Sequence, residues 1–292
     1  MARFRELLTN RNFFLLWLGQ TVSNFGDRLN QMALVALVYQ SNPGSEIALA
    51  KLISFTIIPV FIIGPIAGVW VDRLNKKDIM IISDVARGVL VLLIPLFIVM
   101  KQILLVYFVI FVLFSISRFF IPSKMALIPE IVPKDKLLMA NSLQDTTHII
   151  GNVVGLVVAG VIVNIAAIGA IGGFYIDSLS FFISAALIAM IARPAFSRRV
   201  KDDLRTTREA LGNSIRRSIF SEIRQGLGYF MERRSMIFIL TALFVFMAGV
   251  GAVSCVIIVF IQEAFGNATR DLGFLGMFLV IGLFLGTVLF AK

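Results

Sequence analysis

Charged residues are scarce in this sequence. Lys, Arg, Asp and Glu together make up 15% of the 292 residues, whereas 59% are hydrophobic and the mean hydropathy is +0.94. A soluble globular domain averages about 25% charged and about 45–50% apolar residues. The chain therefore lacks the polar groups that would cover a water-exposed surface, which excludes an ordinary soluble domain and indicates a surface that meets lipid.

Cysteine and histidine are almost absent, with one residue of each, Cys255 and His148. One cysteine cannot form a disulfide within the chain, and this pair cannot supply the ligand cluster of a zinc site. Cys255 lies in an apolar run, which favours a buried, inert thiol. A phosphate-binding loop of the G-x-x-x-x-G-K-[ST] type is also missing. We therefore expect no metal, no cofactor, no ATP hydrolysis and no soluble-enzyme site.

Long apolar runs are what the sequence has instead. Each run is about 20 residues or longer, which is enough to cross a bilayer as a helix. Because the runs are continuous rather than alternating, helices satisfy the backbone in lipid better than a barrel would. The sequence predicts an all-α, multi-pass membrane protein, and the basic start is followed by a segment too long for a signal peptide. Eight spans are expected, at about 12–39, 46–71, 78–100, 102–122, 140–166, 168–192, 236–262 and 271–290.

A long polar insert divides the predicted spans into six and two. We expect residues 1–192 to form a six-helix half, 193–235 a cytoplasmic linker, and 236–292 the first two helices of a second half. Within the linker, the stretch 221–236 has the pattern of an amphipathic helix at the membrane surface, and the alternative is a solvated linker helix. Glycine pairs four residues apart in "GPIAGVWVDR" and "GLFLGTVLFAK" support a second unit that begins like the first.

The pairs are Gly64 with Gly68 and Gly282 with Gly286. Each pair lies near the inner end of the second expected helix after a break, and this shared position is the whole of the repeat signal.

The net charge of +10 is concentrated in particular loops. Lys and Arg gather at the start, between the second and third spans, between the fourth and fifth, and in the insert, whereas the opposite side has few. Basic loops stay on the cytoplasmic side of a membrane. We therefore expect both termini to be cytoplasmic in the inner membrane of a bacterium, with lipid headgroup binding as a secondary effect and no nucleic-acid partner.

A polar stripe interrupts the first span. Its members are three or four residues apart and share one helical face, with Arg28 at the edge: Gln20, Asn24, Asp27 and Gln31. An ionisable group deep inside a membrane-spanning helix costs at least about 2.5–3.5 kcal/mol on insertion scales. The stripe should therefore face a water-filled cavity or a protein partner. We interpret it as a face that binds substrate and couples to protons. The alternative is that Asp27 and Arg28 neutralise each other or pair with neighbouring helices.

A second cluster of charge lies at the inner ends of the second and third spans. A carboxylate at the C-terminal end of a helix is disfavoured by the helix dipole and needs a cation or another helix's N-terminus. We interpret the cluster as a conformational gate at a cytoplasmic helix junction. It comprises Gly68, Asp72, Arg73, Lys76, Lys77, Asp84 and Arg87, with Arg118 expected either to pair with an acid such as Asp84 or to extend toward the membrane surface.

Three further acidic or titratable sites invite simpler interpretations. Asp145 and His148, three residues apart, are expected to form a pair at the membrane interface, although a histidine can titrate near neutral pH. Asp177 is expected near the outer surface as a helix cap or hydrogen-bond acceptor, and Glu263 is expected to be solvated.

The pattern Gly68-x-x-x-Asp72-Arg73-x-x-Lys76-Lys77 resembles the signature loop of the major facilitator superfamily. Members usually have a glycine near position 75 or 76, where this chain has Asn75 and Lys76. The stretches "LWLGQTVSNFGDRLNQMAL", "IPSKMALIPEIVPKDKLLMANSL" and "FYIDSLSFFISAALIAMI" resemble the drug, macrolide and siderophore exporter branch of that family. The resemblance covers the whole chain and implies two six-helix halves, of which about four helices would be missing here.

The resemblance also implies roles for particular residues. Asp72 would help to hold the outward-facing state by contacting a helix of the second half. The antiporter motif of the fifth helix, roughly G-P-x-x-G-G, corresponds to Gly151-Asn152-x-x-Gly155-Leu156. The replaced proline and final glycine weaken an antiporter assignment. Helix packing is still expected through Gly151, Gly155 and Gly160.

We therefore expect a secondary transporter that exports small amphipathic compounds in exchange for protons by alternating access, as in multidrug efflux. Its partners would be a small-molecule substrate, protons and the lipid bilayer. One alternative is a lysophospholipid flippase of the same fold, and another is a non-transporting truncated fragment. The substrate, the coupling ion, the direction of transport and the oligomeric state stay open at this point.

Overall fold

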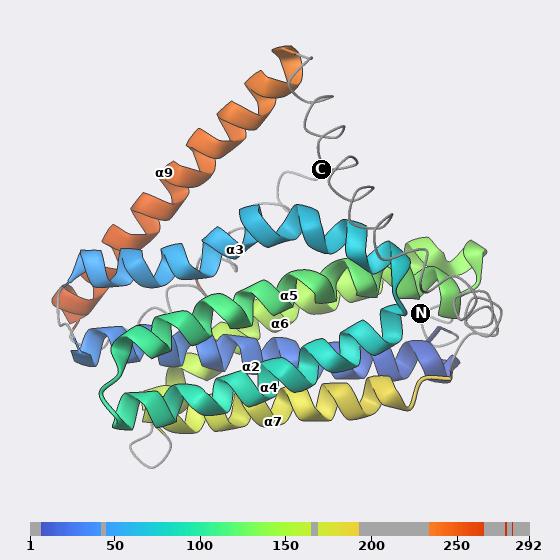
Figure 1. The fold of residues 1–292 in the computed structure, drawn as a ribbon, viewed down its shortest axis with the longest axis horizontal. Coiled ribbons are helices and arrows are strands. Elements are labelled where there is room, and N and C mark those ends of the chain that lie inside the picture. Colours follow the sequence, from blue (N-terminus) through green and yellow to red (C-terminus); the bar gives the residue numbers. More distant parts are fainter. Residues whose placement is uncertain are drawn as a thin grey trace, which may run out of the picture.

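The computed structural model describes residues 7–41, 45–164, 169–192 and 234–265, together with positions 278 and 282. The described helices follow one another back and forth along a common axis (Figure 1). They are α2 (Arg11–Ser41), α3 (Glu46–Arg73), α4 (Lys76–Val99), α5 (Ile103–Ile131), the short 3₁₀ helix η1 (Lys134–Lys136), α6 (Leu137–Asn164), α7 (Gly169–Ala189) and α9 (Arg234–Phe265).

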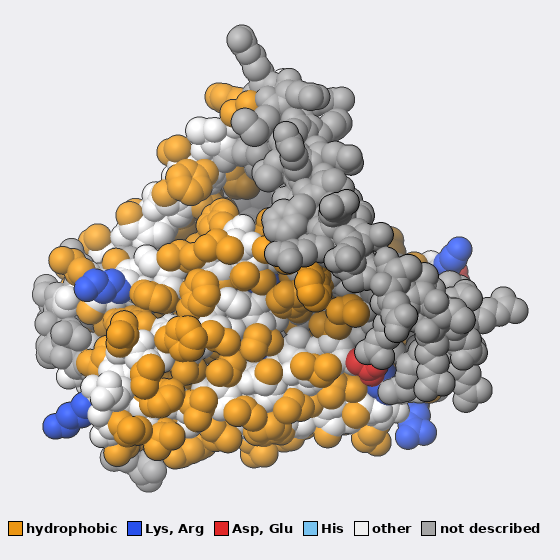
Figure 2. Space-filling model, in the orientation of Figure 1, with side chains coloured by type: hydrophobic (Ala, Val, Ile, Leu, Met, Phe, Trp, Pro, Cys, Tyr) orange, Lys and Arg blue, Asp and Glu red, His pale blue; other side chains and the backbone are white. Residues whose placement is uncertain are grey.

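Length and composition make six of these helices able to cross a membrane: α3, α4, α5, α6, α7 and α9. Helix α2 is 31 residues long, but its polar stripe makes it less apolar than the others. Figure 2 shows hydrophobic side chains over most of the visible face, with Lys and Arg confined to its two ends. This distribution matches a bundle whose sides meet lipid and whose ends meet water.

Among the described residues, the predicted spans agree with the helices within a few residues except at α5. The span expected at about 102–122 is too short, because α5 continues through Pro122 and Pro129 to Ile131. Proline removes one backbone donor, yet neighbouring helices in a membrane bundle can satisfy the freed groups, so it does not end α5. The amphipathic stretch 221–236 and the eighth span at 271–290 lie almost entirely outside the described residues.

Helices α2 to α7 pack together, whereas α9 leans away and touches α3 near one end (Figure 1). Two clusters of buried apolar side chains fill the bundle. One cluster includes Leu29, Ile110 and Phe174, and the other includes Phe13 and Ile188. They lie toward opposite ends of α2, and the polar stripe of α2 falls between them.

The closest helix pair, α2 and α7, meets through small residues that recur every seven positions on α2. Gly19 faces Ser184, where an added Cβ would lie 3.3 Å from the hydroxyl oxygen. Gly26 faces Ser180, and an added Cβ would overlap its hydroxyl and lie 2.9 Å from its Cβ. One more repeat along α2, Ala33 packs 3.3 Å from the Cβ position of Gly173. These contacts hold the two helices antiparallel at short range.

The glycines singled out in the sequence differ in what surrounds them. A Cβ added at Gly68 or Gly151 would meet no atom of the described residues within 4 Å. At Gly155 it would lie 2.8 Å from Cγ of Arg28, so this glycine makes room for a side chain of α2. Gly160 lies farther along α6. The role of Gly151 in helix packing stays a prediction, and a Cβ at this position has open space among the described residues.

Candidate functional site

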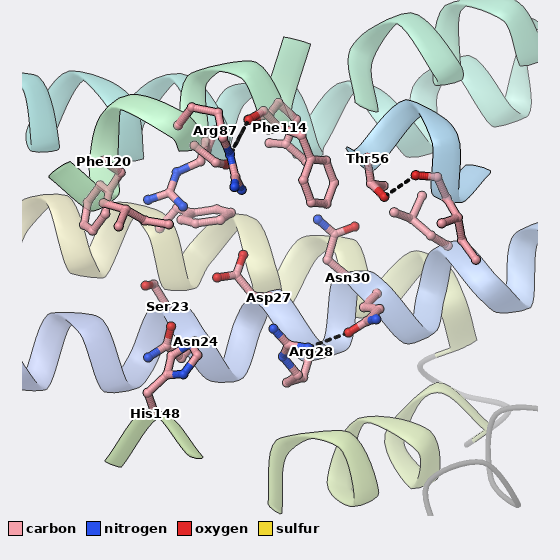
Figure 3. A pocket seen from close by; sticks show the side chains of 18 of the residues that line it. Ser23, Asn24, Asp27, Arg28, Asn30, Thr56, Arg87, Phe114, Phe120 and His148 are labelled. Atoms are coloured by element: carbon pink, nitrogen blue, oxygen red, sulfur yellow. Dashed lines mark hydrogen bonds between the residues drawn. The ribbon is translucent and has the colours of Figure 1, made fainter. Parts of the chain in front are cut away.

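A cavity of about 530 Å³ opens between the helices at the level of the polar stripe. It is bordered by residues of α2, α3, α4, α5, α6 and α7 and by one residue of α9 (Figure 3). The polar and charged lining residues are Gln20, Ser23, Asn24, Asp27, Arg28, Asn30, Gln31, Thr56, Arg87, Ser117, Arg118, Lys124, Asp145 and His148. This volume lies in the range of about 300–1,000 Å³ that small-molecule sites occupy.

All five residues of the predicted substrate and proton face line this cavity. Asp27 is near the middle of the 31-residue α2, and Figure 3 shows its carboxylate pointing into the space between the helices. The guanidinium of Arg28 donates to Oε1 of Gln31 at 2.6 Å rather than to Asp27. The direct Asp27–Arg28 pair that was the alternative is therefore not formed among the described contacts.

Arg87 enters the cavity from α4 and is held in place by a buried carboxylate. Its guanidinium donates to Asp84, whose side chain has no exposed surface. The same guanidinium lies 4.6 Å from the ring centre of Phe120 and 4.3 Å from that of Phe181. Stacking on two rings and pairing with one carboxylate fix the cation at the cavity wall. From the sequence this pair was assigned to the charge cluster at the inner end of the third span, and in the structure it lies inside the bundle, at the cavity wall.

Arg118 also differs from the expectation. Its Nε donates to the backbone oxygen of Phe114 at 3.3 Å, and Asp84 is already occupied by Arg87. Arg118 therefore lines the cavity instead of pairing with Asp84. The acceptor of Nε lies one turn away on the same helix, α5, and the other guanidinium nitrogens of Arg118 remain at the cavity.

Two residues set aside at the sequence level also lie in the site. Asp145 and His148 both line the cavity, and Nδ1 of His148 lies 3.2 Å from the side-chain nitrogen of Asn152. The partner of His148 is thus one turn away on α6, and the described contacts contain no direct bond with Asp145. Lys124 reaches the same space from α5. Ser117 and Lys124, seven residues apart on α5, share one helical face, and this spacing is the signal that could have found Lys124.

Asp177 is deeply buried rather than near the outer surface. It lies on α7 beside α2, where the Asn30 amide is within hydrogen-bonding reach of its carboxylate. The Ser180 hydroxyl lies 3.4 Å from the same carboxylate and donates to the backbone oxygen of Asp177 at 2.7 Å. Asp177 is thus a hydrogen-bond acceptor, as expected, and it is buried because α7 packs closely against α2, which the local sequence pattern does not record.

The end of the bundle where α2 begins is joined by polar contacts from the predicted gate. Nζ of Lys77 donates to the backbone oxygens of Ala189 at 2.7 Å and Ile191 at 2.6 Å. A cation on the last carbonyls of a helix satisfies groups that have no partner inside the helix. Lys76 forms an ion pair with Glu130 at 3.6 Å, which links α4 to the end of α5.

Asn75 begins α4 between those contacts. Its side chain accepts from the backbone of Lys77 and Asp78, as expected of an N-cap residue. A residue other than glycine therefore serves this position well. Asp72 and Arg73 end α3, and their side chains lie outside the described residues, as do those of Cys255 and Glu263.

The sequence was also compared with known families and proteins. The model of the Major Facilitator Superfamily matches residues 16–292, almost the whole chain. The chain belongs to the Major Facilitator Superfamily. The fold is accordingly that of an all-α, multi-pass integral membrane protein of a transporter family, as the resemblance of the sequence implied.

Several curated members of this superfamily are similar to the chain. The uncharacterized MFS-type transporter YfiS of Bacillus subtilis (strain 168) is 26% identical over 65% of this chain and 44% of its own length. The uncharacterized MFS-type transporter YkuC of the same strain is 25% identical over 82% and 54%. Macrolide efflux protein A of Streptococcus pyogenes is 29% identical over 65% and 46%. The chain thus matches about half the length of these relatives.

Proposed function

We propose that this member of the superfamily is a secondary transporter that exports small amphipathic compounds in exchange for protons. The observation that carries the proposal is a carboxylate, Asp27, at a cavity in the middle of a membrane bundle. Ionisable groups at such depth mark substrate and proton pathways in membrane proteins. The similarity to a macrolide efflux protein supports export and an amphipathic substrate.

In this mechanism Asp27 binds a proton and the substrate alternately. Gln20, Asn24 and Gln31 supply neutral donors and acceptors on the same face of α2, and Arg28 and Arg87 set the electrostatic potential around the carboxylate. Superfamily members expose a central site to each side of the membrane in turn by rocking one bundle against another. The contacts of Lys76 and Lys77 at the end of the bundle belong to the conformational gate, together with Gly68, Asp72 and Arg73.

We further propose that both termini face the cytoplasm and that the protein resides in the bacterial inner membrane. The support is the distribution of Lys and Arg, which favours the loops at the end where α2 begins. We assign residues 1–192 to one transport half, 193–235 to a cytoplasmic linker and 236–292 to the second half.

The test is gradient-driven transport in proteoliposomes with an imposed pH difference and erythromycin as the probe. Asp27→Asn keeps the size and hydrogen-bonding capacity of the side chain but cannot ionise. We expect this variant to bind erythromycin yet to lose at least tenfold of the gradient-driven flux. Asp135→Asn, which changes an exposed carboxylate on η1, is the control and should transport normally. Full gradient-driven flux by Asp27→Asn would refute coupling at this residue.

A further inference from the structure

A carboxyl group on α7 is buried between the helices and does not line the cavity. Asp177 lies near the middle of α7, has no exposed surface and is not among the cavity residues. It faces the close contact of α7 with α2, where a Cβ added at Gly26 would lie 2.5 Å from its Oδ1 atom. The carboxyl group is therefore enclosed by protein inside a membrane-spanning bundle.

Few charges act on this carboxyl group. Asp27 of α2 and Arg87 of α4 are the charged side chains that affect it from the helices packed against α7. Arg87 already forms an ion pair with Asp84, and Asp177 forms none within the described part of the chain. A buried carboxylate without its own cation is costly, and a second carboxylate nearby adds repulsion. A bound proton removes both costs, because it makes the group neutral.

The hydrogen bonds around Asp177 lack one donor. The amide of Asn30 on α2 and the hydroxyl of Ser180 are within hydrogen-bonding reach of the carboxyl group. Oδ2 of Asp177 and Oδ1 of Asn30 are nevertheless buried and have no hydrogen-bond partner among the described residues. Both atoms accept hydrogen bonds and neither donates, so an ionised Asp177 cannot satisfy the pair. A protonated carboxyl group supplies the missing donor.

We propose that Asp177 binds a proton and that the neutral acid pairs with the amide of Asn30. An acid and an amide can form two hydrogen bonds in opposite directions, one donated by each group. Asn30 also lines the cavity, one turn along α2 from Asp27 (Figure 3). Protonated Asp177 is thus a positioning residue that fixes a polar group of the cavity wall. It is a second proton-binding site, separate from the exchange proposed at Asp27 and not dependent on it.

Infrared spectroscopy of the full chain in nanodiscs tests for the proton directly. A protonated carboxyl group has a C=O stretching band that carboxylates and amides do not share. The spectrum of Asp177→Asn is subtracted from that of the wild type at neutral pH. We expect the difference to contain a protonated-carboxyl band and no carboxylate bands. Carboxylate bands in its place would overturn the proposal, and Asp135→Asn, which changes an exposed carboxylate on η1, is the control that should give them.

Asn30→Leu tests the acid–amide pair and needs no change at Asp177. We expect this variant to keep the protonated-carboxyl band and to shift its frequency, because the C=O group loses a hydrogen bond. Gln31→Leu, which changes the next side chain on α2, should leave the frequency unchanged. An unshifted band in Asn30→Leu, or an equal shift in Gln31→Leu, would refute the pairing. A wild-type spectrum without any protonated-carboxyl band would refute the proton whether or not Asp177→Asn folds.

Stability gives a second readout of the same pair. Asp177→Asn is neutral and keeps hydrogen-bonding groups, so it should unfold at the wild-type fraction of sodium dodecyl sulfate. Asp177→Leu has a similar size but leaves the Asn30 amide unpaired, so it should unfold at a lower fraction. If the two variants unfold at the same fraction, the neutral pair does not stabilise this contact and the proposal fails. None of these measurements involves transport, so proton-coupled export at Asp27 can fail while this proposal stands, and the reverse.

Discussion

Removal of the Arg87 guanidinium should destabilise the bundle strongly, because Asp84 lies behind it with no exposed surface. Breaking a buried ion pair by removing one partner costs about 3–5 kcal/mol, since the other charge stays buried without compensation. The contacts of Arg87 with the rings of Phe120 and Phe181 would be lost as well. We therefore expect Arg87→Gln to lower the free energy of unfolding by at least about 3 kcal/mol.

The double variant separates the charge from the packing. Asp84→Asn combined with Arg87→Gln removes both charges and leaves two amides that can bond to each other. Replacing both partners of a buried pair is often nearly neutral, so most of the lost stability should return. The comparison is a double-mutant cycle, which isolates the coupling between the two side chains.

The assay is reversible unfolding of the purified protein in mixed micelles by titration with sodium dodecyl sulfate, followed by circular dichroism. Lys76→Gln is the matched control, because it breaks an ion pair with Glu130 whose side chains are 26% and 32% exposed. An exposed pair contributes about 0–1 kcal/mol. If Arg87→Gln is no less stable than Lys76→Gln, or if the double variant is as unstable as Arg87→Gln, the buried pair does not stabilise the bundle in the way argued.

Two further predictions follow from the packing and the charge distribution. Gly26→Ala should be less stable than Gly151→Ala by about 1–3 kcal/mol in the same unfolding assay, because only the added Cβ of the first variant meets Ser180. Both variants gain the same helix propensity, so this gain cancels in the comparison. Equal stability would refute the close approach of α2 and α7. In a Cys255→Ser background, Gln102→Cys should react with a membrane-impermeant maleimide added to intact cells and Lys134→Cys should not, and the reverse pattern would overturn the proposed orientation.

The helices and the polar stripe could be predicted from the sequence because each depends on local pattern. Apolar length sets a membrane helix, and a spacing of three and four residues puts Gln20, Asn24, Asp27 and Gln31 on one face. The extent of α5 could not be predicted this way. Whether Pro122 ends a helix depends on the neighbouring helices, which no local pattern records.

The pairing of side chains between helices could not be predicted from the sequence either. Asp84 has Arg87 three residues away and also Arg118 on another helix within the same bundle, and the sequence does not say which is closer. The structure resolves the choice through α4 itself, where the i and i+3 positions face each other. His148 was predicted at the membrane interface, whereas it lines the cavity. Its depth depends on the tilt of α6, which the sequence does not give. The small residues every seven positions on α2 were visible in the sequence and are the signal that the prediction of packing glycines missed.

The two faces of α2 are coupled by their position in the chain. Gly19 and Gly26 face α7, and each directly precedes a residue that lines the cavity, Gln20 and Asp27. Close packing leaves a helix little freedom to slide or rotate, because few other positions of the helix would pack its side chains as densely. The glycine contacts with α7 therefore fix the height and direction of the Asp27 carboxylate. Helix α4, which carries Arg87, is held against α7 as well, because the Gly88 backbone oxygen accepts from the Ser178 hydroxyl at 2.8 Å. A site built on two helices that share a third as their support keeps its charges in register without a direct bond between them, and so leaves Asp27 available to a ligand or a proton.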